Sequence, residues 1–453
     1  MSLSIVILAA GQGTRMRSDV PKVLHTVAGQ PLLAHVIATA RGLDASAIHV
    51  VYGHGGEQVR KTLAHLDVNW VLQAQQLGTG HAVAQALPAI ADKDTVLVLY
   101  GDVPLITAAT LTPLLAHAQH GALGLLTAHL DNPQGYGRIV RDAQGAAARI
   151  VEQKDANETE RRITEVNTGM LAVNAASLKR WIAQLDNRNA QGEFYLTDII
   201  ALAARDHVSV HTAQASSIDE ILGVNDRVQL ADLERRYQQR EAARLMRDGV
   251  SLRDPQRFDL RGELTVGRDV VIDINVIIEG KVHLGDRVHI GPNTLLREVD
   301  IAADTQVFSH CVIEQARIGA RCRIGPFARI RPETTLSDDV HIGNFVEIKK
   351  SRVADGSKIN HLSYVGDSDV GKRVNIGAGT ITCNYDGANK HRTVIEDDVF
   401  IGSDTQLIAP VTVGKGATLG AGTTLTRDAP AGELTLARTG QKTIAGWKRP
   451  VKK

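Results

Sequence analysis

The sequence is poor in cysteine, in net charge and in long apolar runs, and each shortage excludes a class of protein. Its three cysteines form no Cys-x-x-Cys pair, which argues against a disulfide-stapled secreted domain and predicts reduced thiols. A net charge of +1 gives no electrostatic basis for binding nucleic acid. The apolar run Ile5–Ala10 is too short to span a membrane, and no basic segment precedes it. We therefore expect a cytoplasmic protein with no nucleic-acid partner and no membrane insertion.

Aromatic residues are also scarce, at 4% of the chain, because much of its apolar content lies in a repeat of small aliphatic residues. Aliphatic residues recur at every sixth position in stretches between Leu264 and Leu425, and a second row follows two positions later. A helix turns 100° per residue and would scatter this repeat, whereas alternate residues of a strand share one face. Glycine often follows the aliphatic residue, as at Gly343 and Gly402, and we expect it to supply the corners. The pattern predicts a parallel β-helix of roughly ten coils, because a β-sandwich, the alternative, would not keep a six-residue frame for so long.

The first half of the chain has a different pattern, in which apolar runs alternate with helical segments. The runs at 5–10, 48–52 and 96–100 are continuously apolar, as in strands that are buried on both faces. With helices expected at 31–41, 56–64 and 79–87, the alternation predicts an α/β domain with a Rossmann-like mixed sheet. A long amphipathic helix then leads to the hexads. The expected parts are the α/β domain at 1–226, a helical linker at 227–249, the β-helix at 250–437 and a basic tail at 438–453.

A glycine loop follows the first strand and is the first candidate for chemistry. The strand runs into Gly11-Gln12-Gly13-Thr14-Arg15, where bare backbone N–H groups at the carboxyl edge of an α/β sheet can bind phosphate. Arg15 and Lys22 could neutralise phosphate charge there. Met16 replaces the third glycine of a dinucleotide-binding fingerprint and the chain has no GxxxxGK, so neither of these motifs is present. Taken alone, the loop fits a tight turn equally well.

Two oxygen-bearing side chains stand at the ends of expected elements. Asp102 follows the strand at 96–100, and a carboxylate at that edge of the sheet could hold a divalent metal that bridges phosphates. Asn225 precedes the linker helix. Both residues also have ordinary structural explanations, because Asp is common in turns and Asn is common as an N-cap.

The motifs together resemble a known family. The run Leu8-Ala9-Ala10-Gly11-Gln12-Gly13-Thr14-Arg15, with Lys22 after it, is similar to the signature of sugar-1-phosphate nucleotidyltransferases. Joined to hexads that contain Asn360–Tyr364 and Asn384–Gly387, the chain resembles over essentially its whole length the bacterial bifunctional N-acetylglucosamine-1-phosphate uridyltransferases and glucosamine-1-phosphate acetyltransferases. The resemblance implies acetyl transfer from acetyl-CoA to glucosamine 1-phosphate, followed by uridylyl transfer from UTP with release of pyrophosphate. The product, UDP-N-acetylglucosamine, would be a precursor for peptidoglycan and lipopolysaccharide.

The resemblance places the uridylyl-transfer site in the α/β domain. Arg15 and Lys22 would act on the phosphates, and Asp102 and Asn225 would hold Mg²⁺. A phosphate oxygen of the sugar would attack the α-phosphorus directly, so that positioning and charge neutralisation would supply most of the catalysis. The residues implied at the nucleotide and the sugar are Leu8, Ala9, Ala10, Gly11, Lys22, Gln73, Gly78, Thr79, Tyr100, Gly101, Asp102, Gly137, Glu152, Asn167 and Asn225.

A second site is expected in the β-helix. The segment 380–394 breaks the hexad frame, and insertions in solenoids often form binding loops. An amine is a sufficient nucleophile for a thioester, so Cys383 is not expected to take part. His361 is a candidate general base, although most of the 17 histidines are expected to be structural, and the resemblance gives it that role. The other implied residues are Arg331, Lys349, Tyr364 and Asn375 for the sugar phosphate, and Ala378, Asn384, Tyr385, Ser403, Ala421 and Arg438 for acetyl-CoA.

The resemblance also implies a left-handed coil and a homotrimer formed through the β-helix, and flat prism faces would suit lateral association. Two other hypotheses compete with the bifunctional enzyme. A single-activity sugar-1-phosphate nucleotidyltransferase could carry a β-helix that only regulates or oligomerises, but it would not need His361 and the insert at 380–394. The other alternative is a structural or binding solenoid with a degenerate first domain. Such a domain could have lost Lys22 and Asp102, and the presence of both residues counts against it. The basic tail fits the phosphates of coenzyme A and a solvated tail equally well.

Overall fold

The computed structural model describes residues 2–53, 55–437 and 440–449, and the chain forms two compact units. The first unit is Met1–Tyr237 and the second is Gln238–Lys453, so the boundary lies inside the long helix α8 (Arg227–Arg247). Each unit has its own hydrophobic core. Within the part of the chain that is described, no helix is both long and apolar enough to cross a membrane.

The first unit is built on a mixed sheet, as predicted. Its strands lie in the order β11-β7-β10-β6-β1-β4-β5, with β10 antiparallel to β6 and β7, and a β8–β9 hairpin pairs with β10. Leu8 of β1 lies opposite Tyr100 of β6, so the carboxyl ends of these two strands meet at one edge of the sheet. The strands are β1 (Leu3–Ala9), β4 (Ala47–Tyr52), β5 (Asn69–Leu72), β6 (Thr95–Tyr100), β7 (Leu123–His129), β8 (Arg138–Arg141), β9 (Ala147–Val151), β10 (Glu165–Asn174) and β11 (Val210–Gln214), beside a separate pair β2 (Thr26–Val27) and β3 (Gln30–Pro31).

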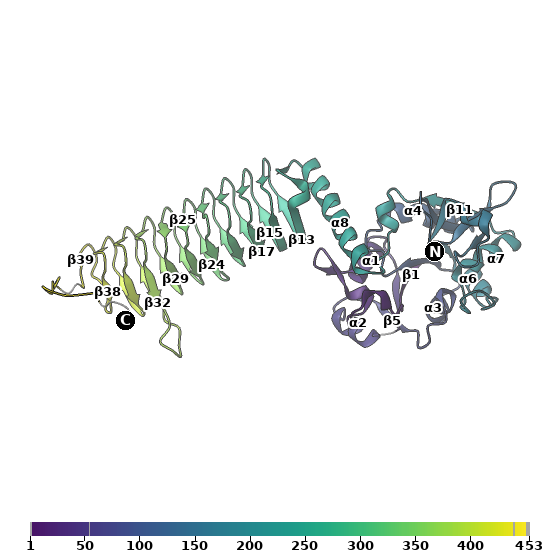
Figure 1. Ribbon diagram of the computed structural model, residues 1–453, viewed down its shortest axis with the longest axis horizontal. Coiled ribbons are helices and arrows are strands. Elements are labelled where there is room, and N and C mark those ends of the chain that lie inside the picture. The colour runs from purple at the N-terminus through teal and green to yellow at the C-terminus, as the bar shows by residue number, and fades with distance from the viewer. Residues whose placement is uncertain (1, 54, 438–439, 450–453) are drawn as a thin grey trace. The chain divides into compact units, whose positions relative to one another are not determined.

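Helices pack against both faces of this sheet, and Figure 1 shows them around β1. Ile5 and Ile7 of β1 join a core with residues of α1 and α4, whereas Val6 and Leu8 join a second core with residues of α3, α6 and α7. Because alternate residues enter different cores, the continuous apolar run does mark a strand buried on both faces. Burial of each such side chain contributes about 1.5–3 kcal/mol. Helix α3 ends at Ala86, one residue earlier than expected, and a 3₁₀ turn that contains Pro88 follows it. The helices are α1 (Leu32–Arg41), α2 (Gly56–Thr62), α3 (Thr79–Ala86), α4 (Ala108–Gln119), α5 (Glu158–Arg161), α6 (Ala175–Ile182) and α7 (Ile199–Arg205).

The second unit is a parallel β-helix whose strands stack one behind another in Figure 1. One side is an 11-stranded sheet, in agreement with roughly ten coils, and the other two sides form a 17-stranded sheet. The left-handed winding stays a prediction. The first side contains β12 (Ser251–Leu252), β14 (Val271–Ile272), β16 (His289–Ile290), β19 (Gln306–Val307), β22 (Arg323–Ile324), β25 (His341–Asn344), β28 (Lys358–His361), β31 (Asn375–Ile376), β34 (Phe400–Ile401), β37 (Thr418–Leu419) and β39 (Leu434–Thr435). The 17-stranded sheet contains β13 (Phe258–Val266), β15 (Val276–Leu284), β17 (Leu295–Arg297), β18 (Asp300–Ile301), β20 (Val312–Glu314), β21 (Ala316–Ile318), β23 (Arg329–Ile330), β24 (Thr334–Leu336), β26 (Glu347–Lys349), β27 (Arg352–Val353), β29 (Tyr364–Gly366), β30 (Ser368–Val370), β32 (Ile381–Cys383), β33 (Thr393–Ile395), β35 (Gln406–Ile408), β36 (Val411–Val413) and β38 (Thr424–Leu425).

The expectation that the hexad glycines supply left-handed corners was wrong for most of them, although Gly325 has φ +96°. Many corner residues are not glycine but adopt a left-handed backbone, among them Asp304 with φ 62° and Phe345 with φ 55°. The glycines after the aliphatic positions instead lie where neighbouring coils approach each other. A Cβ on Gly402 would lie 2.5 Å from the backbone nitrogen of Ala421, and one on Gly343 would overlap the Asn360 backbone. These glycines are therefore required by coil spacing rather than by φ.

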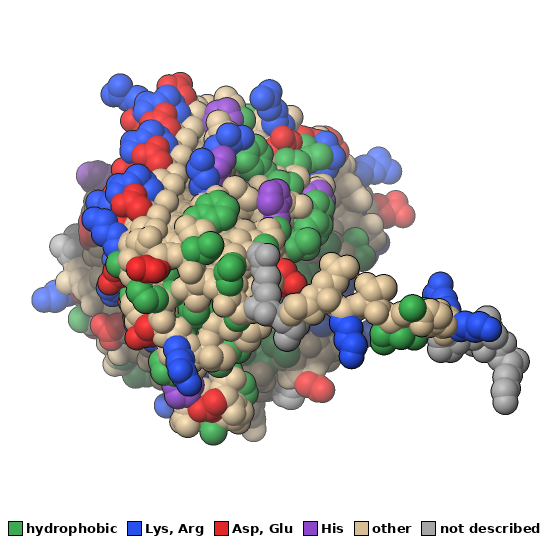
Figure 2. Space-filling model, turned by 90° about the vertical axis from the view of Figure 1, so that its left-hand side faces the viewer, with side chains coloured by type: hydrophobic (Ala, Val, Ile, Leu, Met, Phe, Trp, Pro, Cys, Tyr) green, Lys and Arg blue, Asp and Glu red, His purple; other side chains and the backbone are tan. Residues whose placement is uncertain are grey.

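The surface of the β-helix carries charges of both signs side by side, and Figure 2 shows Lys and Arg side chains next to Asp and Glu side chains along one edge. Ion pairs join residues of successive coils, with N–O distances of 2.6 Å for Arg287–Asp304 and 2.6 Å for Arg373–Asp398. Each such exposed pair contributes about 0–1 kcal/mol. The paired charges along this edge therefore largely neutralise one another.

Candidate functional sites

The loop after β1 is shaped around Lys22. Gly13 has φ +62°, and a Cβ there would lie 2.7 Å from the Cβ of Lys22. Both a left-handed backbone and the close approach of Lys22 thus require glycine at this position. The loop then forms a 3₁₀ turn at Thr14–Met16, and Lys22 begins a second turn, Lys22–Leu24. This folding returns Lys22 to the carboxyl edge of the sheet.

Two contacts join the predicted phosphate-binding residues to the predicted metal ligands. Lys22 Nζ lies 2.5 Å from Asp102 Oδ2, and the two side chains are 14% and 18% exposed. Arg15 Nη2 donates a 2.9 Å hydrogen bond to Asn225 Oδ1. Asp102 and Asn225, 123 positions apart in the sequence, line one cavity of about 370 Å³ together with Arg15. The structure therefore brings these four residues to one place.

A neighbouring cavity of about 450 Å³ collects most of the residues predicted at the nucleotide. Tyr100 and Asp102 line both cavities, so the two form adjoining halves of one site. Burial, reinforced by the charges of Glu152 and Asp102, raises the pKa of Tyr100 above its ordinary value, so the phenol stays neutral. The predicted residues that line this cavity are Leu8, Ala9, Ala10, Gly11, Lys22, Gln73, Gly78, Thr79, Tyr100 and Asp102.

The three residues predicted at the sugar come together where β8, β9 and β10 pair. Asn167 donates its backbone N–H to Gly137 O at 2.8 Å, and a Cβ on Gly137 would lie 3.4 Å from the Glu152 carboxylate. Burial raises the pKa of Glu152, against the opposing effect of a 3.1 Å hydrogen bond from Thr197 Oγ1. Gly101, the remaining prediction, follows β6 and donates its N–H to Leu8 O at 2.9 Å.

The donor set suits Mg²⁺ if phosphates complete the coordination. Within the described ranges, no three His, Cys, Asp or Glu side chains form a metal-binding group. Asp102 and Asn225 offer a carboxylate and an amide oxygen, and Mg²⁺ is commonly held by one or two such oxygens, with phosphates and water supplying the rest. Both oxygens already accept from cationic side chains, which shows that the site can accommodate positive charge there.

In the β-helix, His361 ends β28 and is held by one residue of the preceding coil. Asn344 Oδ1 lies 2.9 Å from His361 Nδ1, and the two residues are register partners of β25 and β28. An amide oxygen only accepts, so in the neutral ring the proton lies on Nδ1 and the lone pair on Nε2. His361 is exposed, and a lone pair that faces solvent is available to a substrate.

The predicted sugar-phosphate residues occupy two sides of the β-helix. Arg331 and Lys349 lie at equivalent positions on the side formed by β23, β26 and β29, and Tyr364 lies on the same side, opposite Glu347. Their side chains contact acidic or amide partners: Arg331–Glu347 at 2.7 Å, Lys349–Asp367 at 3.9 Å and Tyr364–Asn384 at 3.4 Å. Asn375 lies on the other side, at the start of β31, opposite Lys358 of the His361 strand.

The predicted acetyl-CoA residues fall into a column and a loop. Backbone hydrogen bonds place His361, Ala378, Ser403 and Ala421 on successive coils: Gly379 N–H donates to His361 O, Asp404 N–H to Ala378 O, and Gly422 N–H to Ser403 O. Asn384 and Tyr385 begin the loop that breaks the frame, and Lys390 lies 4.1 Å from the Tyr385 ring centroid. Arg438 lies outside the described residues.

The environment of Cys383 does not favour a nucleophilic role. Burial raises the pKa of its thiol, which disfavours the reactive thiolate. All three cysteines are free thiols.

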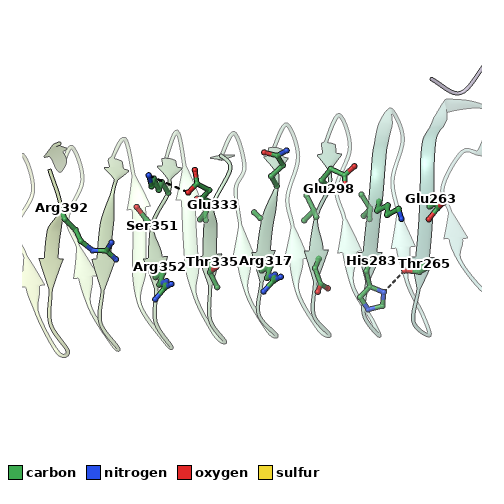
Figure 3. A pocket seen from close by; sticks show the side chains of 18 residues that line it. Glu263, Thr265, His283, Glu298, Arg317, Glu333, Thr335, Ser351, Arg352 and Arg392 are labelled. Atoms are coloured by element: carbon green, nitrogen blue, oxygen red, sulfur yellow. Dashed lines mark hydrogen bonds and ion pairs between the residues drawn. The ribbon is translucent and has the colours of Figure 1, made fainter. Parts of the chain in front are cut away.

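A separate groove of about 840 Å³ runs along the β-helix and is drawn in Figure 3. Its walls carry mixed charges, including Glu298, Arg317, Glu333 and Arg352, around a floor of small residues. Among the described residues that were predicted for acetyl transfer, none belongs to its lining. A choice by cavity volume alone would select this groove, which holds none of the predicted residues. The column of residues at His361 remains the better candidate for the acetyl-transfer site.

Several residues of the two sites were not predicted. His81 lies 3.0 Å from the side-chain nitrogen of Gln73, and buried Arg138 donates to Gln153 Oε1 at 2.7 Å beside the predicted sugar position. Asn344 could have been found, because it stands one coil, 17 residues, before His361. The other two contacts leave no periodic signal in the sequence.

Known families match both units. Residues 5–191 match a family described as the MobA-like NTP transferase domain, residues 260–344 the GMPPB C-terminal domain, and residues 392–427 bacterial transferase hexapeptide (six repeats). Among curated proteins, the bifunctional protein GlmU of Thiobacillus denitrificans (strain ATCC 25259 / T1) is 64% identical over 99% of this chain and 98% of its own length. The bifunctional protein GlmU of Azoarcus sp. (strain BH72) is 61% identical over 99% of this chain and 100% of its own length.

Proposed function

Because the chain belongs to the family of bifunctional GlmU proteins, we propose that its two units carry the two successive transfers at the sites described above. The chain is a bifunctional transferase with a nucleotidyltransferase half and a hexapeptide acetyltransferase half. The β-helix acetylates glucosamine 1-phosphate, and the first unit joins the product to UTP. The observation that carries the residue assignment is the single cavity at the ends of β1 and β6, where Lys22 and Asp102 meet the residues predicted at the nucleotide.

In the first unit, a phosphate oxygen of N-acetylglucosamine 1-phosphate attacks the α-phosphorus of UTP. The new phosphorus–oxygen bond forms as the bond to the β-phosphate breaks, and pyrophosphate leaves. Lys22 and Arg15 turn to the phosphates and offset their charge, and the neutral Tyr100 adds no negative charge at the junction of the two cavities. When bound, Mg²⁺ would neutralise further phosphate charge, with Asp102 and Asn225 as two of its oxygen ligands.

In the second unit, the amine of glucosamine 1-phosphate attacks the thioester carbonyl of acetyl-CoA. His361 Nε2 takes the amine proton as the carbon–nitrogen bond forms. The carbon–sulfur bond then breaks, and the imidazolium returns the proton to the leaving thiolate. Asn344 fixes the tautomer that makes Nε2 the base, because it accepts from Nδ1–H at 2.9 Å.

The assembly is a homotrimer that covers an exposed apolar column. His310 stacks on Phe327 at 4.7 Å between ring centroids, and Phe327 stacks on Phe345 at 5.2 Å. The exposed fractions are 46% for Phe327, 54% for Phe345 and 64% for Leu362 on the next coil. Apolar residues stacked at one edge and left in water are typical of an interface. Light scattering should give three chains per particle for the wild type and one for the double variant F327E/F345E.

The protein works in the cytoplasm, and its thiols support this location. Cys311 and Cys322 are buried, and burial raises the pKa of each thiol to about 11. Such thiols resist oxidation, and they form no disulfide.

A paired product assay tests the two-site assignment. Glucosamine 1-phosphate, acetyl-CoA, UTP and Mg²⁺ are supplied, and thiol and pyrophosphate are followed separately. Wild type should release both, with pyrophosphate only when acetyl-CoA is present. D102A should lose pyrophosphate release and keep thiol release, and H361A should do the reverse when N-acetylglucosamine 1-phosphate is supplied. Pyrophosphate without any thiol would favour the single-activity enzyme instead.

A further inference from the structure

We propose that Arg138 is a positioning residue for the sugar substrate of the first unit, because it ties together the segments that hold the residues predicted at the sugar. The inference rests on the uridylyl transfer proposed above and adds a determinant of how N-acetylglucosamine 1-phosphate is bound. Arg138 begins β8, is 1% exposed and belongs to the lining of neither cavity of the site. Its guanidinium therefore acts through other residues rather than on the substrate itself.

The Arg138 guanidinium donates to acceptors in three separate segments. Nη1 donates to Tyr136 O, and Nη2 donates to Gln153 Oε1 at 2.7 Å and to Arg161 O at 3.5 Å. Gln153 Oε1 also accepts the Gly135 N–H at 3.3 Å. Since both of its neighbours are donors, the end of the Gln153 amide that faces Arg138 is its oxygen. Every one of these contacts therefore joins a donor to an acceptor.

Two of these acceptors flank the residues predicted at the sugar. Tyr136 precedes Gly137, and Gln153 follows Glu152. Gly137 and Glu152 lie close together in the β8–β9 hairpin, since a Cβ on Gly137 would lie 3.4 Å from the Glu152 carboxylate. By bonding to the residue before one and the residue after the other, Arg138 fixes the separation of this pair.

The third acceptor lies on the connection to the remaining predicted residue. Arg161 ends α5, and the chain then enters β10, which contains Asn167. Asn167 in turn donates its backbone N–H to Gly137 O at 2.8 Å. The segment 134–136, which Arg138 holds at Tyr136 O, lines the 370 Å³ cavity together with Asp102. The same guanidinium thus fixes the sugar residues relative to the predicted metal ligand.

A purely structural role does not explain the burial of this charge. The acceptors of Arg138 are neutral oxygens, and its Nε has no hydrogen-bond partner among the described residues. A buried guanidinium without a carboxylate partner keeps much of its desolvation cost. Burial raises the pKa of Glu152, and the charge of Arg138 opposes that shift, which favours the ionised carboxylate at the sugar. An arrangement that costs stability in this way is typical of a functional site.

The test measures KM and kcat for N-acetylglucosamine 1-phosphate and for UTP, with pyrophosphate release as the readout. R138M removes every donor and keeps an apolar stem. We expect it to raise KM for the sugar phosphate about tenfold, equivalent to about 1.4 kcal/mol, and to keep KM for UTP within about twofold. R138K keeps the charge and can serve one acceptor, so its KM for the sugar phosphate should rise only about threefold. If R138M does not fold, the selective effect of R138K decides the question.

The split between KM and kcat separates positioning from a structural role. A smaller folded fraction alone lowers the apparent kcat and leaves both KM values unchanged, and that result would overturn the proposal. An equal rise in KM for both substrates would overturn it as well. If wild type itself released no pyrophosphate from N-acetylglucosamine 1-phosphate and UTP, the proposed function would fail, rather than the role of Arg138.

A double-mutant cycle and a matched control test the contact itself. Q153L removes the acceptor that follows Glu152 and should raise KM for the sugar phosphate about threefold. R138M/Q153L should be no worse than R138M, at about tenfold, and an additive rise of about thirtyfold would count against the coupling. Arg141 lies in the same strand, forms an ion pair with Glu165 at 2.7 Å and belongs to neither cavity lining. R141M should therefore keep KM for the sugar phosphate within about twofold, and a rise as large as that of R138M would overturn the proposal.

Discussion

The predicted metal ligands contact the two cationic side chains that should bind phosphate. Lys22 Nζ lies 2.5 Å from Asp102 Oδ2, and Arg15 donates to Asn225 Oδ1 at 2.9 Å. A divalent cation that enters first must displace both. We therefore expect K22M to bind a divalent cation more tightly than wild type when nucleotide is absent.

The size of this effect follows from the burial of the ion pair. Lys22 and Asp102 are 14% and 18% exposed. A surface ion pair contributes about 0–1 kcal/mol, and breaking a fully buried one costs about 3–5 kcal/mol. A competition of about 1.4 kcal/mol lies between these limits and corresponds to about tenfold in affinity. Arg15 bonds a neutral amide at an exposed position, so R15M should gain only about twofold.

Mn²⁺ binding followed by electron paramagnetic resonance measures this affinity without turnover. K22M and D102A break the same ion pair but should move the affinity in opposite directions, since D102A removes a ligand. R17M, which removes a neighbouring exposed cation, controls for the loss of positive charge alone. K22M binding no tighter than R17M would refute the competition. With UTP present the advantage of K22M should disappear, because phosphates then draw Lys22 away from Asp102.

Three further predictions concern other parts of the chain. H361A should slow thiol release by about 10²–10⁴-fold and leave pyrophosphate release from N-acetylglucosamine 1-phosphate unchanged, and a parallel loss of both rates would contradict separate sites. G169A should lower the free energy of unfolding by about 2–5 kcal/mol in urea titrations, because Gly169 has φ +85° and a Cβ there would lie 2.6 Å from Tyr100 Cζ. The control G145A, with φ +84° and no atom within 4 Å, should lose only the backbone share of about 1–2 kcal/mol, and equal losses would refute the packing argument. Burial lowers the pKa of His49, which is 3% exposed with both ring nitrogens unpartnered among the described residues. The unfolded chain then binds the proton more readily, so the first unit should lose stability as the pH falls below about 6.5. H49L should flatten that slope in urea titrations followed by tryptophan fluorescence, and an unaltered slope would count against it.

The fold was predictable because its signal is local. In the β-helix, Ile324, Ile342, Ile359, Ile376 and Ile401 stack in register and are at most 3% exposed, as the hexad frame requires. The glycine expectation failed for a physical reason. A glycine can serve a left-handed φ or a close approach, and only the second requirement, set by the next coil, applies to Gly343 and Gly402.

The candidate sites were predictable where strand ends position them and not where side chains meet across elements. Asp102 follows a buried strand, and the order of β1 and β6 carries it to the loop that holds Lys22. The His81–Gln73 contact joins a helix to the end of an edge strand, and nothing in either segment indicates that their side chains would meet. Such contacts depend on tertiary packing, which a single sequence does not specify.

The two units differ in how they build a site, and this difference explains why the second site is harder to predict. In the β-helix most coils repeat one backbone pattern, so the inward positions need only aliphatic residues and the outward positions are free to vary. A functional residue such as His361 therefore occupies an ordinary outward position, and its role depends on which coils lie beside it. Asn344 on the preceding coil sets its tautomer, and Ala378 and Ser403 continue the column on the following coils. The hexad periodicity therefore predicts the β-helix but not the position of its site. In the α/β unit, the end of a buried strand indicates both the sheet and the place where a ligand binds.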